Sequence, residues 1–258
     1  MLAAGRTSAI GVRNVSKRYG AQVVLDGVSL EVPVGMRLGL IGPAATGKSV
    51  LAKLVCGLET PDSGDIEVLG EAIVGRTEVS LGPLRRRIGM LFQASALFDY
   101  MSVGANVMFP LERRGDLEPD AMQFRVSERI KAVGLAGSEE KLTGELSGGM
   151  RKRVGIARAT VADPELVIYD EPTAGLDPVT TQKIYDLLAA DHGRTKATVL
   201  AISSDVAALA RFVDEIAMLY RGKIIYRGPA ATIADAPDPI VRQFVRGEID
   251  GPLDEVRA

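Results

Sequence analysis

Short apolar runs separated by turn residues dominate the first part of the chain. Residues 10–35 read IGVRNVSKRYGAQVVLDGVSLEVPVG, and their alternating apolar positions predict edge strands of an antiparallel sheet. The run MRLGLI (36–41) predicts a buried strand, and SVLAKLVC (49–56) carries apolar side chains at helical spacing. A strand, a glycine-containing loop and a helix are therefore expected in direct succession.

The pattern changes near residue 94. Before it, LETPDSGDIEVLG (58–70) predicts a turn leading into a strand, and residues 88–92 predict a buried strand. From 94 to 163 the strand signals disappear, and helices are expected to begin at Pro119 and near Ser147. We interpret 94–163 as a helical insert within an α/β core.

Strand signals return after residue 164. The runs ELVIYDEP (165–172) and ATVLAIS (197–203) predict buried strands, and residues 215–228 predict a hairpin that turns at Arg221-Gly222. In the tail, 237–258, a short amphipathic helix is expected, followed by a polar segment with no sign of packing.

The loop between the first buried strand and its helix reads GPAATGKS, from Gly42 to Ser49. It fits the phosphate-loop pattern G-x-x-x-x-G-K-[ST] at every fixed position and has the required strand–loop–helix context. The two glycines let successive backbone N–H groups point into one concavity, and the helix N-terminus adds partial positive charge. Lys48 is expected to reach the β- and γ-phosphates of a nucleoside triphosphate, and the Ser49 hydroxyl to bind Mg²⁺.

Composition limits the class of protein. The chain has 258 residues, 25% of them charged and 47% hydrophobic, which suits one large domain or a domain with an inserted subdomain. A net charge of −2 gives no overall basic field, which argues against a nucleic-acid partner. The single cysteine, Cys56, excludes an intrachain disulfide and is expected in the core. Without a signal-peptide pattern or an apolar run of roughly 18 residues, we expect a soluble, cytoplasmic protein.

Two further motifs carry candidate chemistry. Asp170 and Glu171 are adjacent carboxylates at the end of a predicted strand, where one can serve a Mg²⁺ shell and the other an attacking water; a plain acidic turn is the alternative. LSGGM (146–150) places Ser147 at a helix N-terminus, which is either an anion site or an ordinary N-cap. Tyr19, just before Gly20, is on local sequence a half-buried aromatic at a turn.

Together, GPAATGKS, Gln93, LSGGM, LVIYDEP and AGLDP resemble the motifs of ATP-binding-cassette (ABC) ATPases in order and spacing, over about residues 10–230. The resemblance implies an α/β P-loop NTPase fold with a RecA-like core, an antiparallel β subdomain and an inserted helical subdomain. It also implies a homodimer, because in this family neither chain completes an ATP site alone.

The resemblance assigns roles to individual residues. Tyr19 resembles the aromatic that stacks on adenine, Gln93 the Q-loop glutamine that senses Mg²⁺ and the attacking water, and Asp177 the D-loop aspartate at the dimer seam. Ser147, Gly148 and Gly149 resemble the signature that caps the γ-phosphate of the ATP held by the second copy. Asp170 resembles the Mg²⁺-shell carboxylate, and Glu171 the general base. The implied ATP-binding set is Tyr19, Gly42, Pro43, Ala44, Ala45, Thr46, Gly47, Lys48, Ser49, Val50, Ser147, Gly148, Gly149 and Asp177. The implied catalytic set is Glu171, Lys48, Gln93 and Ser204, and the metal set is Ser49, Gln93 and Asp170.

A finer resemblance, carried by residues 91–111, 216–228 and 237–247, is to the ATPase subunit of Mla-type phospholipid transporters. It implies an integral-membrane permease, an MCE-domain lipid-binding protein and a small accessory subunit as partners, and a peripheral location on the cytoplasmic face of the inner membrane. In that group the apolar stretch after the Q-loop receives the permease's coupling helix. The residues concerned, Leu97, Phe98, Tyr100 and Met101, are either an exposed patch of this kind or core of the helical subdomain.

One position departs from the family. Its histidine after the strand that follows Asp170 is replaced by Ser204 in ISSD (202–205), and the only histidine, His192, does not match. Because one transition-state donor typically contributes roughly 100- to 1,000-fold in rate, we expect slow but real hydrolysis. The alternatives are an ATP-gated dimer clamp and the ATPase of another ABC importer or exporter. An ABC-type DNA-repair protein is disfavoured, since too few residues separate the phosphate loop from the signature for a long coiled coil.

The motifs suggest four segments. Residues 1–93 form the first part of the nucleotide-binding core with the antiparallel β subdomain, and 94–163 the helical signature subdomain. Residues 164–236 form the second part of the core, and 237–258 a C-terminal tail, with Ile240 and Phe244 expected to dock on the partner ATPase or an accessory subunit.

Overall fold

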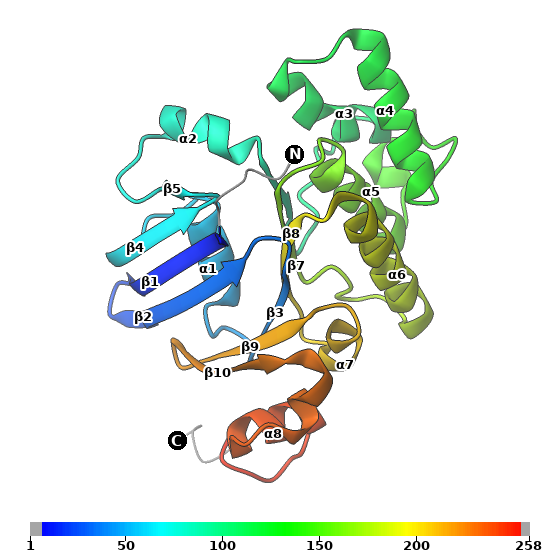
Figure 1. The fold of residues 1–258 in the computed structure, drawn as a ribbon. Coiled ribbons are helices and arrows are strands. Elements are labelled where there is room, and N and C mark those ends of the chain that lie inside the picture. Colours follow the sequence, from blue (N-terminus) through cyan, green and yellow to red (C-terminus); the bar gives the residue numbers. More distant parts are fainter. Residues whose placement is uncertain (1–6, 254–258) are drawn as a thin grey trace. The chain divides into compact units, whose positions relative to one another are not determined.

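The computed structural model describes residues 7–253, which form two compact units (Figure 1). The first unit comprises the chain up to Leu81 and from Thr198 onward, and the second comprises Gly82–Ala197. The four segments proposed from the motifs divide the chain at other positions, and their three boundaries remain a prediction.

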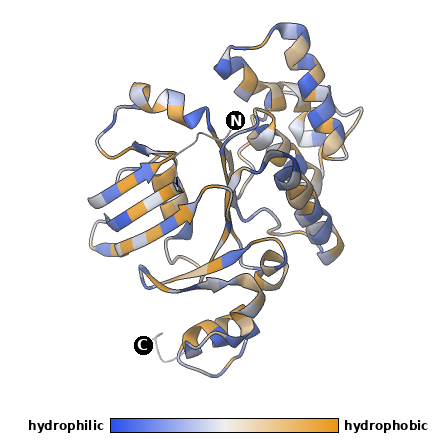
Figure 2. Cartoon of the chain, viewed as in Figure 1, coloured by the Kyte–Doolittle hydropathy of each residue, from blue (hydrophilic) through white to orange (hydrophobic). Residues whose placement is uncertain are grey.

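An antiparallel sheet in the first unit has the strand order β2-β1-β4-β5. Its strands are β1 (Ser8–Tyr19), β2 (Gln22–Pro33), β4 (Ser63–Val68) and β5 (Glu71–Ala72). Apolar and polar residues alternate along β4 and the second half of β2 (Figure 2), and Val12, Leu25 and Ile66 are buried. Because one face of such a sheet packs on the core and the other meets solvent, this alternation produces the expected antiparallel subdomain.

Parallel strands in the same unit carry the phosphate loop. β3 (Arg37–Ile41) lies between β8 (Thr198–Ile202) and β9 (Glu215–Tyr220), and pairs parallel with both. β10 (Lys223–Pro229) pairs antiparallel with β9, across the predicted turn at Arg221-Gly222. The loop leads into α1 (Lys48–Val55), and Cys56 directly after it is buried, as expected. The short helix α7 (Val206–Ala210) follows β8.

The C-terminal part contains the predicted amphipathic helix, α8 (Pro239–Arg246), preceded by the 3-10 segment η2 (Ala230–Asp235). The expectation that the following segment is unpacked is wrong as far as residue 253. Gln243 is buried, its Oε1 accepts from the Leu253 N–H at 2.7 Å, and its amide donates to the carbonyls of Glu248 and Ile249. One polar side chain thus folds the chain back onto α8, which a search for apolar residues misses. Residues 254–258 lie outside the described part.

In the second unit, β6 (Ile88–Leu91) pairs parallel with β7 (Leu166–Asp170). The helix α2 (Glu78–Arg85), which spans the boundary between the units, was not predicted because Gly82 and Pro83 lie inside it. The remaining helices are α3 (Val103–Arg114), α4 (Pro119–Ala132), the 3-10 turn η1 (Thr143–Glu145), α5 (Gly148–Thr160) and α6 (Pro178–Thr195). The predicted helix starts at Pro119 and near Ser147 are confirmed.

Helices α3, α4 and α5 enclose a hydrophobic cluster, as the periodicity of the insert predicted. Val107, Leu111, Ile130 and Val154 are fully buried in it. Each fully buried aliphatic side chain contributes about 1.5–3 kcal/mol relative to exposure. This cluster positions the N-terminal end of α5, where the signature lies.

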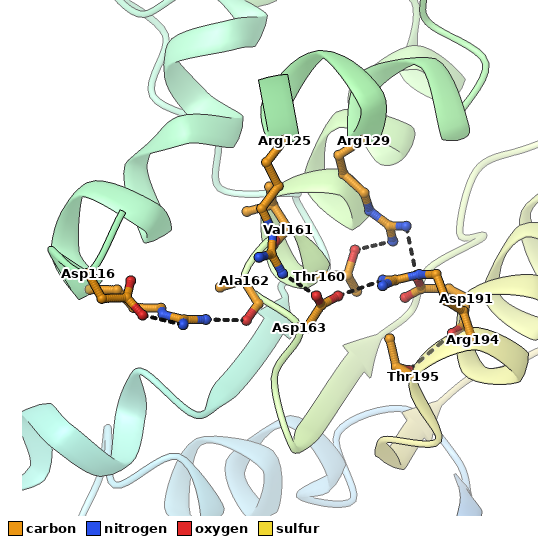
Figure 3. Close-up of polar contacts among 11 residues, drawn as sticks. Asp116, Arg125, Arg129, Thr160, Val161, Ala162, Asp163, Asp191, Arg194 and Thr195 are labelled. Atoms are coloured by element: carbon orange, nitrogen blue, oxygen red, sulfur yellow. Dashed lines mark hydrogen bonds and ion pairs between the residues drawn. The ribbon is translucent and has the colours of Figure 1, made fainter. Parts of the chain in front are cut away.

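A polar network links three helices of this unit (Figure 3). The Arg129 guanidinium of α4 pairs with the Asp191 carboxylate of α6 at 2.7 Å and also donates to the Thr160 hydroxyl of α5. Arg194 of α6 contacts both Asp191, at 3.1 Å, and Asp163, at 2.7 Å. Because Arg129 and Asp191 are both buried, the pair fixes how α4 lies against α6.

Candidate functional site

The phosphate loop has a backbone that only glycine can adopt at two positions. Gly42 has φ 143° and Gly47 has φ 99°. A Cβ on Gly42 would lie 2.1 Å from the Leu219 carbonyl oxygen, and one on Gly47 would lie 2.8 Å from Val24 Cγ1. The conformation and the close packing together explain why both glycines are needed.

Lys48 lies at the start of α1 with its ammonium turned over the loop. Its Nζ donates to the carbonyls of Gly42 and Pro43, each at 2.7 Å, and the Thr46 hydroxyl donates to the Pro43 carbonyl at 2.9 Å. The loop residues Ala44 and Ala45 are exposed. A phosphate that enters here meets a cation, a helix N-terminus and loop N–H groups, which together form an anion site.

Ser204 emerges beside the loop, on the same edge of the sheet. Leu40 of β3 pairs with Ile202 of β8 in a parallel ladder, so the chain leaves both strands at adjacent carboxyl ends. Ser204 is exposed there, whereas the neighbouring Ser203 is buried and accepts from the Asp205 N–H at 3.1 Å. The structure therefore brings Ser204 and Lys48 to one edge of the first unit.

Tyr19 ends β1 and is 46% exposed. Its hydroxyl donates to the Glu59 carboxylate, and the Lys17 ammonium lies 5.4 Å from the ring centroid. The hydrogen bond to Glu59, with some burial, raises the pKa of Tyr19 to about 12. Glu59 thus orients an accessible aromatic ring, which is the requirement for stacking on a base.

Gln93, Asp170 and Glu171 lie at the carboxyl ends of the two parallel strands of the second unit, where Asp170 is the last residue of β7. Leu91 pairs with Tyr169, so these residues leave β6 and β7 at the same edge. The Asp170 side chain is buried, while Glu171 is partly exposed and has a φ of 50°. A non-glycine residue in the left-handed region is uncommon and is concentrated at functional sites.

Ser147 and Asp177, which were predicted to belong to the signature and the D-loop, are N-caps in the same unit. The Ser147 hydroxyl accepts from the Met150 N–H at 3.3 Å and begins α5. Asp177 accepts from the N–H and the hydroxyl of Thr180, which lowers the pKa of its carboxyl, and begins α6. A Cβ on Gly149 would lie 3.3 Å from Thr180 Cγ2, so the two helix starts are in contact.

Lys152 is a residue that sequence reasoning missed. It lies one turn into α5, is 7% exposed, and its ammonium donates to the carbonyls of Gln93 and Glu171, the latter at 2.9 Å. In the sequence it belongs to the run RKR, which looks like a solvated basic face. No local signal distinguishes it from its two neighbours.

A cavity of about 410 Å³ lies next to the segment that follows Gln93. Phe92, Phe98 and Phe109 line it together with Arg113 and Arg158. The rings of Phe98 and Phe109 are 4.9 Å apart, and the Arg158 guanidinium lies 5.7 Å from the Phe98 ring.

The apolar stretch after Gln93 divides between two environments. Leu97 packs against the helical cluster, whereas Tyr100 is 77% exposed. Leu97 is therefore part of the core of the helical subdomain, and a docking role for the exposed Tyr100 remains a prediction.

Comparison with known proteins identifies the family. The family described as ABC transporter matches residues 25–174. The chain is 36% identical to the intermembrane phospholipid transport system ATP-binding protein MlaF of Escherichia coli K12, over 95% of this chain and 91% of that protein. The chain belongs to the ABC transporter family. It is also 37% identical to TRIGALACTOSYLDIACYLGLYCEROL 3, chloroplastic, of Arabidopsis thaliana, over 95% of this chain and 75% of that protein.

Solved ABC cassettes share the fold. A dimeric ATP-binding cassette in a post-hydrolysis state with ADP and Pi is 27% identical, with a TM-score of 0.79 over 86% of this chain and 98% of that one. The cbiO1 protein of Clostridium perfringens is 27% identical, with a TM-score of 0.81 over 95% and 96%. The P-loop NTPase fold predicted from the motifs is confirmed.

The chain is the ATP-hydrolysing subunit of an ABC transporter, and it binds ATP. Among residues 7–253, no helix combines the length and the apolar character needed to cross a bilayer.

Proposed function

We propose that this ABC ATPase drives the transport of phospholipids across or between membranes. The similarity to MlaF supports the proposal, because it extends over 95% of this chain and 91% of a relative named for phospholipid transport. We further propose that the working complex contains an integral-membrane permease, an MCE-domain lipid-binding protein and a small accessory subunit. The ATPase would then lie on the cytoplasmic face of the inner membrane.

ATP would be bound by backbone N–H groups of the phosphate loop, with Lys48 on its β- and γ-phosphates. Ser49, Gln93 and Asp170 offer a hydroxyl, an amide and a carboxylate oxygen, which is the oxygen-only donor set that Mg²⁺ prefers. When bound, Mg²⁺ neutralises charge that develops on the phosphates. Glu171, partly exposed beside the buried Asp170, would accept the proton of the attacking water.

A second copy would complete each ATP site. Ser147, Gly148 and Gly149 lie at an exposed helix N-terminus that can receive the γ-phosphate of ATP held by the other copy. Asp177, at the start of the adjoining helix, would lie at the seam between copies. The dimeric cassette with ADP and Pi supports this arrangement. Tyr19 would stack on the adenine of the chain's own ATP.

The cavity beside Phe98 and Phe109 would receive a helix of the permease. It is largely apolar, which suits the hydrophobic face of a short amphipathic helix, and the arginines on it favour a carboxylate on that helix. Tyr100 and Met101, near the cavity, would extend the contact.

Isolation of the chain from its native membranes tests the transport proposal. Affinity capture should retain a permease, an MCE-domain protein and phospholipid, identified by mass spectrometry. Capture with a different permease and no phospholipid would keep the ATPase and remove the lipid assignment. A Lys48→Ala variant, which is expected to lose phosphate binding, controls for partners whose capture depends on ATP.

A slow, ATP-gated clamp is the second candidate function, favoured by the exposed Ser204 in place of the family's histidine. In that case ATP mainly locks the dimer, and hydrolysis resets it. A single-turnover burst followed by a stable ATP-bound dimer would favour the clamp, whereas steady turnover stimulated by the permease would favour the pump.

A further inference from the structure

The helix that begins at the signature contacts the catalytic segments through a buried cation. Lys152 of α5 donates to two main-chain oxygens, one on Gln93 and one on Glu171. These two residues lie 78 positions apart in the sequence, at the ends of neighbouring strands. One side chain therefore joins the signature helix, the Q-loop and the strand that carries the proposed base.

Burying this ammonium is costly, so the contact must be specific. Desolvation lowers the pKa of Lys152, and the Glu171 and Asp170 carboxylates oppose that shift. A buried ammonium persists only when hydrogen bonds and opposite charges replace its water. Both are present here, which distinguishes Lys152 from the exposed Arg151 beside it.

The acceptor on Glu171 belongs to a strained residue. A left-handed conformation at a non-glycine residue is unfavourable and persists only where its surroundings enforce it. The Glu171 carbonyl, bound by Lys152 at 2.9 Å, is adjacent to the strained φ of 50°. This backbone conformation decides where the Glu171 carboxylate points.

Close packing leaves α5 no freedom to shift independently of the Q-loop. A Cβ on Gly155 of α5 would lie 2.6 Å from Leu91 Cδ1, and one on Gly89 of β6 would lie 2.0 Å from the Ala159 carbonyl oxygen. Arg158 of the same helix donates to the carbonyls of Ser95 and Ala96, at 2.7 and 2.8 Å. The helix is therefore attached to the whole segment that follows Gln93.

We propose that Lys152 is a positioning residue. It holds the main chain of Gln93 and Glu171 in the arrangement needed for hydrolysis, and it connects that arrangement to the signature helix. The inference rests on the proposed role of Glu171 as general base. It assigns Lys152 an effect on turnover and none on the binding of ATP, because both of its acceptors are main-chain oxygens of residues outside the phosphate loop.

Kinetics of the full chain with ATP and Mg²⁺ test this. Lys152→Met removes both hydrogen bonds and keeps the length of the side chain, and we expect kcat to fall about 10- to 100-fold with KM within twofold, since small misplacements of catalytic groups cost up to about 100-fold. Lys152→Gln keeps a donor and should recover part of kcat. Lys131→Met, which removes a lysine whose side chain is 69% exposed, is the matched control and should behave as wild type.

The following results decide whether Lys152 acts as a positioning residue. A Lys152→Met variant with wild-type kcat overturns the proposal. So does a parallel loss of kcat, nucleotide affinity and melting temperature that Lys152→Gln does not relieve, because that pattern indicates general destabilisation. If Lys152→Met is insoluble, Lys152→Gln alone decides: kcat reduced at unchanged KM supports positioning, and wild-type kcat refutes it. A Glu171→Gln variant that hydrolyses normally would instead refute the assignment of the base.

Discussion

At the scale of single residues, the site depends on side chains whose partners are main-chain atoms. Lys48 binds loop carbonyls, Ser147 and Asp177 cap helices, and Lys152 binds the carbonyls of Gln93 and Glu171. Such contacts fix the backbone, and the backbone then places the groups that are proposed to contact the nucleotide. Substitutions at these positions should therefore change either the rate of ATP hydrolysis or the affinity for ATP, rather than both together.

Ser204 is where a substitution should increase activity. A serine hydroxyl donates one hydrogen bond with short reach, whereas histidine reaches further and can carry charge. We expect Ser204→His to raise steady-state kcat by roughly 100-fold, in line with one added transition-state donor. Phosphate release measured at saturating ATP checks this, with Ser203→Ala as the neighbouring control. A Ser204→His enzyme no faster than wild type would show that Ser204 does not limit turnover.

The Tyr19 hydroxyl should lose its proton at a higher pH than an ordinary tyrosine does. Its pKa of about 12 lies above the usual value of about 10, so the fold favours the neutral phenol. The corresponding contribution to stability is complete below pH 10 and is lost as pH rises through about 12. Removing the acceptor with Glu59→Ala should return the pKa toward 10, as followed by phenolate absorbance, with Tyr19→Phe identifying the signal. An unchanged titration would mean that Glu59 does not hold the hydroxyl.

At the scale of elements, apolar periodicity predicted the buried strands and several helices, but not the two-residue strand β5 or the short helix α7. β3, β7 and β8 are nearly continuous apolar runs, and α4 and α5 each repeat apolar residues on one face. The helix α2 was missed because Gly82 and Pro83 are read as turn residues. The packing of the tail on Gln243 was missed because a buried amide leaves no hydrophobic signal.

The buried ion pair between α4 and α6 predicts how substitutions of its residues change the free energy of unfolding. Arg129→Met leaves the buried Asp191 carboxylate with Arg194 as its remaining cation, and should lower the free energy of unfolding by about 3 kcal/mol. The double variant with Asp191→Leu removes the buried charge as well and should recover most of that loss. Urea unfolding of the three proteins checks this. Equal destabilisation of the single and double variants would contradict the account.

At the scale of the whole molecule, the family was recognised because the spacing of the motifs is specific, although each motif is weak alone. The roles given to the phosphate loop, Asp170-Glu171 and LSGGM remain predictions from the sequence. The burial of Lys152 and the attachment of Arg158 to Ser95 could not be predicted from it, because whether a basic residue is solvated depends on what packs above it. Tertiary contacts decide such positions.

Dimerisation in the presence of ATP tests whether two copies of the chain share each ATP site. Glu171→Gln removes the proposed base and keeps the volume of the side chain, so hydrolysis should fall about 100- to 10,000-fold while ATP still binds. With ATP trapped between two copies, the variant should elute as a dimer in size-exclusion chromatography with light scattering, and as a monomer without nucleotide. Ser147→Arg, which obstructs the signature, should abolish the dimer. A Glu171→Gln protein that stays monomeric with ATP would contradict the shared site.

The acceptors of Lys152 have an evolutionary consequence. Both are main-chain carbonyl oxygens, which every amino acid possesses, so these two hydrogen bonds do not depend on which side chains occupy positions 93 and 171. A related protein can replace the residue at position 171 or 93, or lose hydrolysis altogether, and still keep the hydrogen bonds that connect these segments to the signature helix. Descendants of such a protein that no longer turn over nucleotide would keep the lysine long after the carboxylate had gone.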